Sequence, residues 1–586
     1  MPGKTRDRGR PPERRPPAAG TPAWKALALG AVILAAALVP NWKSLDYDLV
    51  WDDTYILGPR LDVRGWGDVV RIWSTPFDAT LTDESLRRNY FRPAVLLGLS
   101  LDRALASGDP ARAHHAQNLL WYAAGCLFLW LLAWECSGAP LAATAGAVLY
   151  ALHPTHPESV CFVSGRTDLM AGASIFAALW AAARFGPGIG SPWMKLLPAA
   201  AALLPGLFSK EIALAAAPLL PFALWLRDRR IARGDLLRAT AAVAAVAALY
   251  LAARTGVLGP PALPTRAPVE GIEAQLFTSL ALVARYVALL AVPVGLSARH
   301  LVPPSESLAD PWAIAGTITV VAIVLGLVFL ARRRSPWSLP LALFALTMLP
   351  LCNVRILSGA ILAERFLLVP SGAIALGFAL LPARSRRERR DAAPPLLLAG
   401  ALIAVWYATL LGPRVSAWRD EGTLYGSMLR DSPRSPEAHG IAGGHYHRQG
   451  DLRRAADHYR RAYELYPETG EMLLNLIAAE DEMGAADSAR IHARLLVSRF
   501  PDYGAGWYAL GNQYARGGEN DSARAAYEEA LRISPRMAQA ENNLGVVLER
   551  LGRMEEAIAR YRRAIEIDPQ YSDARNNLAR LTGGEP

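Results

Sequence analysis

The stretch from Pro501 to Pro535, PDYGAGWYALGNQYARGGENDSARAAYEEALRISP, determines how the C-terminal part of the chain folds. Small and aromatic residues occupy fixed positions along it, namely Trp507, Leu510, Gly511, Tyr514, Ala523, Tyr527 and Ala530. Prolines recur at one constant interval, as Pro433, Pro467, Pro501, Pro535 and Pro569. Such a repeat predicts a stack of helical hairpins, in which glycine and alanine let two helices approach closely and aromatic rings fill the space between hairpins.

The interval and the pattern are those of the tetratricopeptide repeat (TPR), whose period is about 34 residues. Parts of the pattern recur in the neighbouring units: Gly443, Tyr446, Ala455, Tyr459 and Ala462 in the first, Leu473, Leu476 and Ala489 in the degenerate second, and Leu544, Gly545, Ala557, Tyr561 and Ala564 in the fourth. We therefore predict a TPR α-solenoid over 436–586, with four repeats and a capping helix, after a linker at 414–435.

Before residue 413 the sequence consists of repeated Ala, Leu and Val runs. Of the 586 residues, 52% are hydrophobic and 19% are charged, which fits a membrane part joined to a soluble part. A membrane-spanning helix needs roughly 20 apolar residues. We predict an all-α, polytopic membrane domain over 23–413 with eleven spans, at 24–40, 115–135, 139–152, 167–186, 195–209, 211–226, 236–253, 312–331, 337–353, 365–382 and 394–412.

Basic loops set the orientation of these spans, because Lys and Arg are retained on the cytoplasmic side. The segments expected in the cytoplasm are the basic, Pro-rich tail 1–22, which we expect to be disordered, and the loops 227–233, 332–334 and 384–390. Two further apolar stretches, 93–106 and 275–293, would break this parity and contain charges that each cost about 2.5–3.5 kcal/mol at the centre of a span. We interpret them as interfacial helices. The first outer loop, 41–114, and the TPR domain then lie outside the cytoplasm.

The formal net charge is +10, which in a soluble protein would suggest nucleic-acid binding. Here the basic residues cluster between apolar stretches, as in cytoplasmic loops and at lipid headgroups, so no nucleic-acid partner is expected. The four cysteines match neither a zinc motif nor a disulfide framework.

Charged and histidine side chains gather where the predicted spans meet the outer face. They are Asp52 and Asp53, Arg92, then His153, His156, Glu158, Arg166 and Asp168, the pair Lys210 and Glu211, and the pair Glu364 and Arg365. Each group alone has a structural explanation: loop solvation or a helix cap for the aspartates, an interfacial position for the histidines, and local ion pairs for the two adjacent pairs. Together they share one membrane face, where polar groups are costly unless they are paired or useful.

Seven short motifs precede the TPR tail in a fixed order. They are Trp51-Asp52-Asp53, Tyr90-Phe91-Arg92-Pro93, His114-His115-x-x-Asn118-Leu-Leu120, Leu152-His153-Pro-x-His156-x-Glu158, Ser164-Gly-Arg166-x-Asp168, Ser209-Lys210-Glu211 and Ala363-Glu364-Arg365. In this order they resemble the transmembrane and tetratricopeptide-repeat-containing O-mannosyltransferases, which are glycosyltransferases of the GT-C superfamily. The Ala/Arg-rich composition and the short TPR array look bacterial, so we expect the bacterial inner membrane, with a periplasmic TPR domain.

The resemblance implies an enzyme that moves one mannose-like sugar from a polyprenyl phosphate to an acceptor hydroxyl, such as that of a protein Ser or Thr, with inversion. A hydroxyl is a weak nucleophile at neutral pH, so a base must take its proton as it attacks. Asp52 and Asp53 stand where the superfamily has its base, and either could fill the role. The lipid-phosphate leaving group needs cations, and the candidates are Arg92, Arg166, Lys210 and Arg365.

The remaining polar residues complete the expected donor-binding set. His153, His156 and Glu158 suit a divalent metal, but they could equally form hydrogen bonds to phosphate or sugar, so no cofactor is assigned. Asp168, Glu211 and Glu364 belong to the same implied set.

The TPR domain is expected to bind a protein or peptide acceptor, because a TPR solenoid is normally a binding surface. Asn475, Asn543 and Asn577 occupy the same repeat position. An asparagine side chain both donates and accepts, so a ladder of them could bind peptide amides, although asparagine is also common at this position.

Other functions remain open at this stage. The chain could be a membrane-anchored TPR scaffold without catalytic activity, in which case the outer acids and cations would not converge on one site. An O-antigen-ligase-like enzyme would need a large late outer loop, and the loops at 295–311 and 354–364 are short. A transporter is disfavoured because no inverted repeat is apparent.

Overall fold

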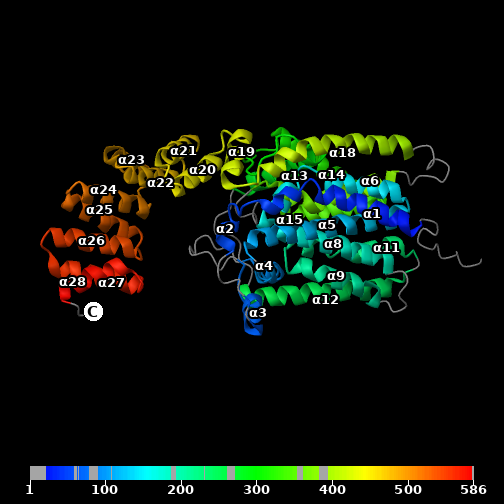
Figure 1. Ribbon diagram of the computed structural model, residues 1–586, viewed down its shortest axis with the longest axis horizontal. Coiled ribbons are helices and arrows are strands. Elements are labelled where there is room, and N and C mark those ends of the chain that lie inside the picture. The colour runs from blue at the N-terminus through cyan, green and yellow to red at the C-terminus, as the bar shows by residue number, and fades with distance from the viewer. Residues whose placement is uncertain are drawn as a thin grey trace, which may run out of the picture. The chain divides into compact units, whose positions relative to one another are not determined.

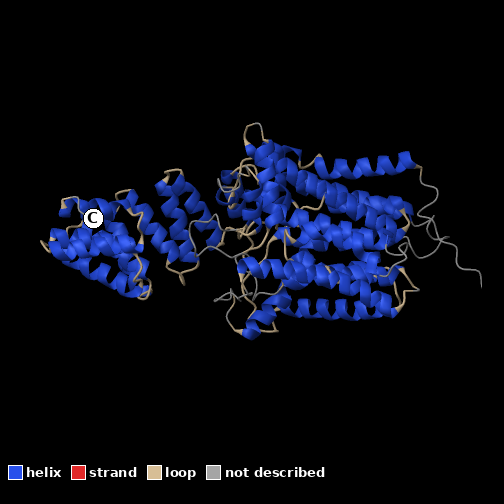
Figure 2. Cartoon of the chain, turned by 90° about the horizontal axis from the view of Figure 1, so that it is seen from below, coloured by secondary structure: helices blue, strands red, loops and turns tan. Residues whose placement is uncertain are grey.

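The computed structural model of the chain describes residues 22–57, 63, 65–77, 90–106, 108–185, 193–229, 231–259, 269, 271–352, 361–381 and 393–583. The predicted disordered tail and the basic loop 384–390 lie outside the described residues. Every regular element in the described part is a helix (Figure 2), so the prediction of an all-α fold is confirmed. The chain divides into two compact units, Met1–Leu424 and Tyr425–Pro586.

The first unit is a bundle of roughly parallel helices (Figure 1). Its longer helices are α1 (Ala23–Leu38), α4 (Pro93–Leu105), α5 (Pro110–Ser137), α6 (Pro140–Ala151), α8 (Arg166–Phe185), α9 (Leu197–Leu207), α11 (Leu219–Arg227), α12 (Arg233–Leu258), α13 (Ile272–Ala291), α14 (Pro311–Arg332), α15 (Ser338–Leu351), α16 (Leu368–Leu380) and α18 (Ala393–Ser416). Short helices are α2 (Asp53–Ile56), α3 (Trp66–Trp73), α7 (Pro157–Cys161) and α10 (Ile212–Ala216). Six of the described helical segments are long and apolar enough to cross a membrane: Pro110–Ser137, Val163–Phe185, Arg233–Leu258, Ile272–Ala291, Pro311–Arg332 and Pro394–Ser416.

Side-chain contacts show which helix ends lie together at one end of this unit, here called the far end. Arg227 at the end of α11 pairs with Glu135 of α5, and Arg184 of α8 lies 4.0 Å from the same carboxylate. Arg334, just after α14, packs over the ring of Trp225 in α11 at 4.5 Å. Helices α5, α8, α11 and α14 therefore all end at the far end.

The opposite end of the unit, here called the site end, is where the other helices finish. Phe208 follows α9, and its ring centroid lies 5.7 Å from that of Tyr250 in α12. Arg414 of α18 pairs at 2.9 Å with Glu364, which precedes α16. Five shorter apolar helical segments also lie in the described residues of this unit, namely Ala23–Leu38, Pro140–Ala151, Leu197–Leu207, Ile212–Arg227 and Ser338–Leu351. The predicted number of eleven spans stays a prediction.

The segment predicted as an interfacial helix at 275–293 forms α13, whose 20 residues are enough to cross a membrane. By length and composition α13 is therefore a candidate span, in contrast to the interfacial helix that the sequence predicted. The last turn of α13 lies at the site end, where the carbonyl of Leu290 is 3.3 Å from a ring nitrogen of His153. The charge of Arg285 in α13 is accommodated by stacking over Trp312 at 4.8 Å.

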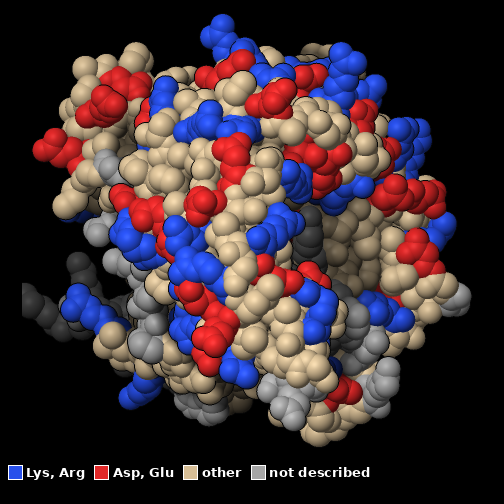
Figure 3. Space-filling model, turned by 90° about the vertical axis from the view of Figure 1, so that its left-hand side faces the viewer, with Lys and Arg blue, Asp and Glu red and all other residues tan. Residues whose placement is uncertain are grey.

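The second unit is a stack of helical hairpins. Its helices are α20 (Pro436–Arg448), α21 (Leu452–Leu465), α22 (Glu471–Glu482), α23 (Ala486–Arg499), α24 (Gly504–Arg516), α25 (Asn520–Ile533), α26 (Ala538–Arg550), α27 (Met554–Ile567) and α28 (Ser572–Thr582), after α19 (Glu421–Asp431) at the boundary. Four hairpins followed by one last helix agree with the predicted TPR solenoid. On the face shown in Figure 3, acidic and basic side chains are interspersed.

The glycines of the repeat allow close helix contact, as the sequence predicts. A Cβ added to Gly511 would lie 2.6 Å from the ring of Tyr527 in the other helix of the hairpin. The first and fourth hairpins have the same Gly–Tyr pair. The degenerate second hairpin reverses the sizes, since Ile477 stands at the glycine position and Ala493 at the tyrosine position, and both are buried. A large residue on either helix therefore fills the same space.

A second repeating glycine marks the turn inside each hairpin. Gly450, Gly484, Gly518 and Gly552 have φ between 74° and 79°, in the left-handed region that favours glycine. They recur at the same interval as the prolines, so this signal was present in the sequence.

Candidate functional site

Asp53 anchors the first outer loop to the segment before α8. Its side chain is completely buried. One carboxylate oxygen accepts the backbone N–H of Val163 at 2.9 Å, and the other accepts the N–H and the hydroxyl of Ser164 at 2.8 and 2.6 Å. Burial raises the pKa of Asp53 to about 7, although these hydrogen bonds act to lower it. Two predicted motifs that are distant in sequence are thus joined directly.

Asp52 has a different environment from Asp53. Its side chain is exposed, and it lies within electrostatic range of Arg365. The preceding residue, Trp51, has a φ of 56°, and its ring centroid is 5.9 Å from that of Phe162. A left-handed φ at a bulky residue costs on the order of 1–3 kcal/mol and tends to occur at functional sites. The strained turn lets two adjacent aspartates differ in exposure, one buried and one accessible.

Three cations predicted from the sequence gather at the site end. Lys210 and Arg365 both lie over the ring of Phe366, at 4.8 and 5.3 Å. Arg92 lies within electrostatic range of Lys210 and stacks on Tyr90 at 4.1 Å. The fold therefore brings Arg92, Lys210 and Arg365 together from three separate segments.

Carboxylates hold these cations in place. Lys210 lies 2.5 Å from Asp168, and Arg92 lies 3.5 Å from Glu211, whose side chain is 41% exposed. Burial lowers the pKa of the Lys210 ammonium, as do the two neighbouring arginines, while Asp168 raises it. The pair of Arg92 with Glu211 is long and partly exposed, and such a pair is weak. An anionic ligand could therefore replace Glu211 at Arg92.

The adjacent residues Glu364 and Arg365 do not pair with each other. Arg365 forms two hydrogen bonds to buried Glu158, at 2.6 Å from its guanidinium and at 3.0 Å from its backbone N–H. Glu364 instead pairs with Arg414 at 2.9 Å and with His300 at 3.0 Å. The structural explanation as a local ion pair is therefore wrong. Arg414 and His300 were not predicted as site residues. Arg414 stands just after the predicted span 394–412, His300 lies inside the loop 295–311, and neither belongs to one of the seven motifs.

The two histidines of the fourth motif, His153 and His156, are core residues. One ring nitrogen of His156 forms a hydrogen bond with the hydroxyl of Tyr122 at 2.9 Å, and the other forms one with the hydroxyl of Ser371 at 3.0 Å. His153 contacts Thr155 at 2.8 Å, and burial lowers its pKa to about 4. Among the described residues no three His, Cys, Asp or Glu side chains form a group that could hold a metal ion. With Glu158 bound to Arg365, this arrangement does not fit the metal site considered above.

Arg166 is not directed to the cations but is completely buried at the start of α8. Its guanidinium lies 2.6 Å from the carboxylate of Asp102 and donates to Asn118 at 2.9 Å and to the carbonyl of His114 at 2.7 Å. Asp102 belongs to α4, the stretch predicted to be interfacial because of this charge. The network ties α4, which begins directly after Arg92, to α5 and α8.

In the TPR unit, two of the three predicted asparagines bind their neighbours. Asn543 donates to Asn512 at 3.0 Å and to the hydroxyl of Tyr508 at 3.2 Å, and Asn577 donates to Asn542 at 3.0 Å. Asn475 is half-buried on α22. The asparagines thus form links between successive hairpins.

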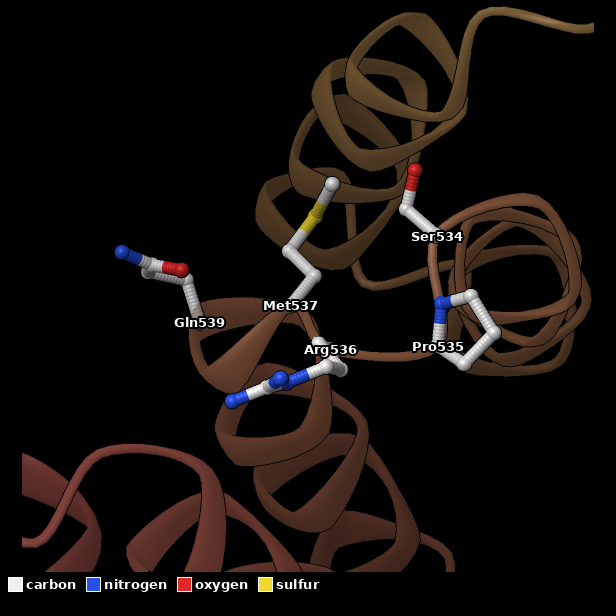
Figure 4. A pocket seen from close by; sticks show the side chains of 5 residues that line it. All are labelled: Ser534, Pro535, Arg536, Met537 and Gln539. Carbon is white, nitrogen blue, oxygen red and sulfur yellow. The ribbon is translucent and has the colours of Figure 1, made fainter. Parts of the chain in front are cut away.

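A hollow lies on the TPR unit at the turn between α25 and α26 (Figure 4). The residues lining it are Ser534, Pro535, Arg536, Met537 and Gln539. None of them is a predicted site residue, and the hollow contains no cluster of titratable groups. The chemistry-bearing residues are those at the site end of the first unit.

The family model of the tetratricopeptide repeat matches residues 423–469, 445–504 and 508–572. The chain is similar to protein O-mannosyl-transferase F38B6.6 of Caenorhabditis elegans, with 23% identity over 466 residues, which are 74% of this chain and 62% of the relative. It is also similar to human protein O-mannosyl-transferase TMTC4, with 27% identity over 163 residues, 25% of this chain and 21% of the relative. The chain thus spans less than two thirds of the length of either protein. The resemblance predicted from the motifs is confirmed.

Among solved structures, the crystal structure of MamA has 24% identity and a TM-score of 0.24, and it covers 25% of this chain and 86% of that chain. YrrB, a TPR protein with an unusual peptide-binding site, has 20% identity and a TM-score of 0.24, over 34% of this chain and 97% of that chain. TM-scores of this size establish no further likeness.

Proposed function

We propose that this chain is an integral-membrane glycosyltransferase that moves a mannose-like sugar from a polyprenyl phosphate to an acceptor hydroxyl, with inversion. The observation that carries the proposal is the convergence of an accessible acid with three cations at one end of the bundle. Asp52 lies within electrostatic range of Arg365, which in turn flanks Phe366 together with Lys210. A non-catalytic scaffold has no need of this convergence. The similarity to protein O-mannosyl-transferases supports the sugar and the acceptor class.

The two aspartates have separate roles in this proposal. A general base must come within hydrogen-bond reach of the hydroxyl whose proton it takes. Asp52 is exposed, so an acceptor can approach it, whereas Asp53 is buried and already accepts three hydrogen bonds. Asp52 is therefore the base. Asp53 is a positioning residue, because it holds the turn that presents Asp52.

The cations stabilise the leaving group. When the bond between sugar and phosphate breaks, negative charge develops on the phosphate, and preorganised cations lower the energy of that state. Arg365 and Lys210 are fixed by Glu158 and Asp168, so they need little reorganisation during the reaction. Arg92, with its weaker partner Glu211, completes the group.

The TPR unit recruits the acceptor in this proposal. Helix α18 ends at the site end, where Arg414 pairs with Glu364, and the chain then continues into the repeats. With the basic loops in the cytoplasm, the repeats and the site are on the outer side of the membrane. A protein or peptide bound by the repeats is then on the same side as the site.

The test is a transfer assay on the full-length protein in lipid nanodiscs. The wild type is incubated with a panel of polyprenyl-phosphate sugars and with Ser/Thr-containing peptides, and donor consumption and glycopeptide are measured by mass spectrometry. Transfer from one donor, and its loss in Asp52→Asn with an unchanged melting temperature, is the expected result. Full activity in the double variant Asp52→Asn, Asp53→Asn would refute the proposal.

A further inference from the structure

Tyr250 in α12 is a buried tyrosine that the proposed function does not use. Its side chain is 1% exposed, and in the described part of the chain its hydroxyl has no hydrogen-bond partner. Buried hydroxyls are almost always satisfied, because an unpaired one loses its hydrogen bonds to water without replacement. The hydroxyl of Tyr250 is therefore a buried donor without an acceptor in the described residues.

A second unpartnered donor lies near Tyr250. The Nε atom of Arg92 is buried and has no hydrogen-bond partner in the described residues. Tyr250 lies within electrostatic range of Arg92, of Glu211 and of Arg254, which is one turn further along α12. An O–H and an N–H donor without acceptors, one of them on a guanidinium and with Arg254 as a second cation nearby, suit an anion that carries several acceptor oxygens.

We propose that the Tyr250 hydroxyl and the Nε atom of Arg92 donate hydrogen bonds to the phosphate of the prenyl-linked donor. This inference rests on the proposed function and adds to it a binding residue that no sequence motif indicated. Arg254 contributes charge to the same phosphate. The phosphate group bound here belongs to a lipid and is not free inorganic phosphate.

The surroundings of Tyr250 favour a lipid. Ala239, Val243 and Tyr250 are the buried residues of α12, and exposed side chains such as Leu237 and Leu249 make up its outward face, where a spanning helix meets lipid. The ring of Tyr250 lies 6.3 Å from that of Phe91 and 5.7 Å from that of Phe208, centroid to centroid. A prenyl chain in the bilayer could pack on these rings while its phosphate reaches Arg92.

The test compares the binding of geranylgeranyl phosphate and of inorganic phosphate to the full-length protein in nanodiscs, for the wild type and Tyr250→Phe. We expect the Kd for the prenyl phosphate to rise by about tenfold or more in the variant, because the lost hydrogen bond was made to a charged group. The melting temperature without ligand should stay the same or rise, because the variant removes an unsatisfied hydroxyl.

Tyr122→Phe is the matched control. Its hydroxyl is also buried but donates to the carbonyl of Ala151 at 2.8 Å. This variant should lower the melting temperature and leave the Kd for prenyl phosphate unchanged. A fall in the melting temperature of Tyr250→Phe as large as that of Tyr122→Phe would show an internal partner and overturn the inference.

Two further outcomes separate this inference from the proposed function. Equal Kd values for the wild type and Tyr250→Phe, with normal sugar transfer in both, overturn the inference and leave the function standing. If the variant binds prenyl phosphate more weakly but the wild type transfers sugar from no donor, the inference stands and the proposed function is overturned. Inorganic phosphate that binds as tightly as the prenyl phosphate would contradict the assignment to a lipid.

Discussion

The carboxylate of Asp53 accepts two hydrogen bonds from Ser164, one from the backbone and one from the hydroxyl, across 111 residues of sequence. This contact ties the turn that presents Asp52 to the start of α8, which also contains Arg166 and Asp168. The chemistry of the site therefore depends on a contact made by a residue that we do not expect to touch the substrate.

Removing parts of this contact should lower stability in steps. Ser164→Ala removes one hydrogen bond and should lower the free energy of unfolding by about 1 kcal/mol. Asp53→Ala leaves the N–H groups of Val163 and Ser164 without an acceptor and should cost about 3 kcal/mol. Thermal unfolding in one detergent measures both. Thr240→Ala, which removes an exposed hydroxyl of α12 bonded to the carbonyl of Leu236, is the control and should have little effect. Equal melting temperatures for Asp53→Ala and this control would contradict the contact.

The stability of the wild type should fall as the pH rises from about 4 to about 7. Burial raises the pKa of Asp53 from 3.8 to about 7, so in this window the folded state holds a proton that the unfolded state has released. The stabilisation from this proton is fully present below the unfolded-state pKa and is lost as the pH rises past the folded-state pKa. Asp53→Asn cannot titrate and should lack this component. The melting temperatures of both proteins are measured over this pH range. A difference between them that does not change with pH would disprove the assignment.

Breaking the ion pair of Arg166 and Asp102 should be among the most destabilising changes in the first unit. Both side chains are buried, at 0% and 5% exposure, and removing one partner leaves the other charge uncompensated. Asp102→Asn should therefore lower the free energy of unfolding by about 3–5 kcal/mol. The double variant Asp102→Asn, Arg166→Gln should be less destabilised than the sum of its single changes. Additive effects in denaturant unfolding would argue against the pair.

Arg365→Gln should slow sugar transfer. Because it also removes the partner of buried Glu158, it should lower the melting temperature, so the assay is run well below that temperature. The loss of one preorganised cation at the leaving group should lower kcat by about 10²–10³-fold. Arg334→Gln, which changes a cation that stacks on Trp225 at the far end, serves as the matched control and should keep the kcat of the wild type. The assay is steady-state transfer from the donor that the wild type uses. A kcat for Arg365→Gln within a few-fold of that of the control would count against its role at the phosphate.

The second TPR hairpin can test whether a large residue on either of its helices fills the same space. Ile477→Gly should open a cavity and cost about 2–5 kcal/mol, and Ala493→Tyr should overpack the same space at about 1–3 kcal/mol. The double variant recreates the Gly–Tyr pair of the other hairpins and should recover most of the loss. Hydrogen exchange of α22 and α23 in the full-length protein measures the local stability. If the double variant exchanges as fast as the worse single variant, the two positions do not share one space.

Features that repeat or extend along the chain could be predicted from the order of the amino acids alone. The TPR hairpins followed from prolines at one constant interval, because each hairpin is one local unit that stacks on the next. The spans followed from apolar runs, because a spanning helix satisfies its own backbone hydrogen bonds. Counting crossings predicted the set of polar residues at one face. The interpretation of 275–293 as an interfacial helix differs from the structure, in which α13 is long and apolar enough to cross a membrane.

The contacts of each polar residue, in contrast, depended on tertiary packing. Glu364 binds Arg414 rather than its neighbour Arg365, and Asp102, a costly charge when considered alone, neutralises Arg166. The division between Asp52 and Asp53 and the isolated hydroxyl of Tyr250 were equally invisible in the sequence. The physical reason is that charge pairing and burial depend on the distance between atoms in space. Helix packing sets that distance between residues tens or hundreds of positions apart, and no local pattern records it.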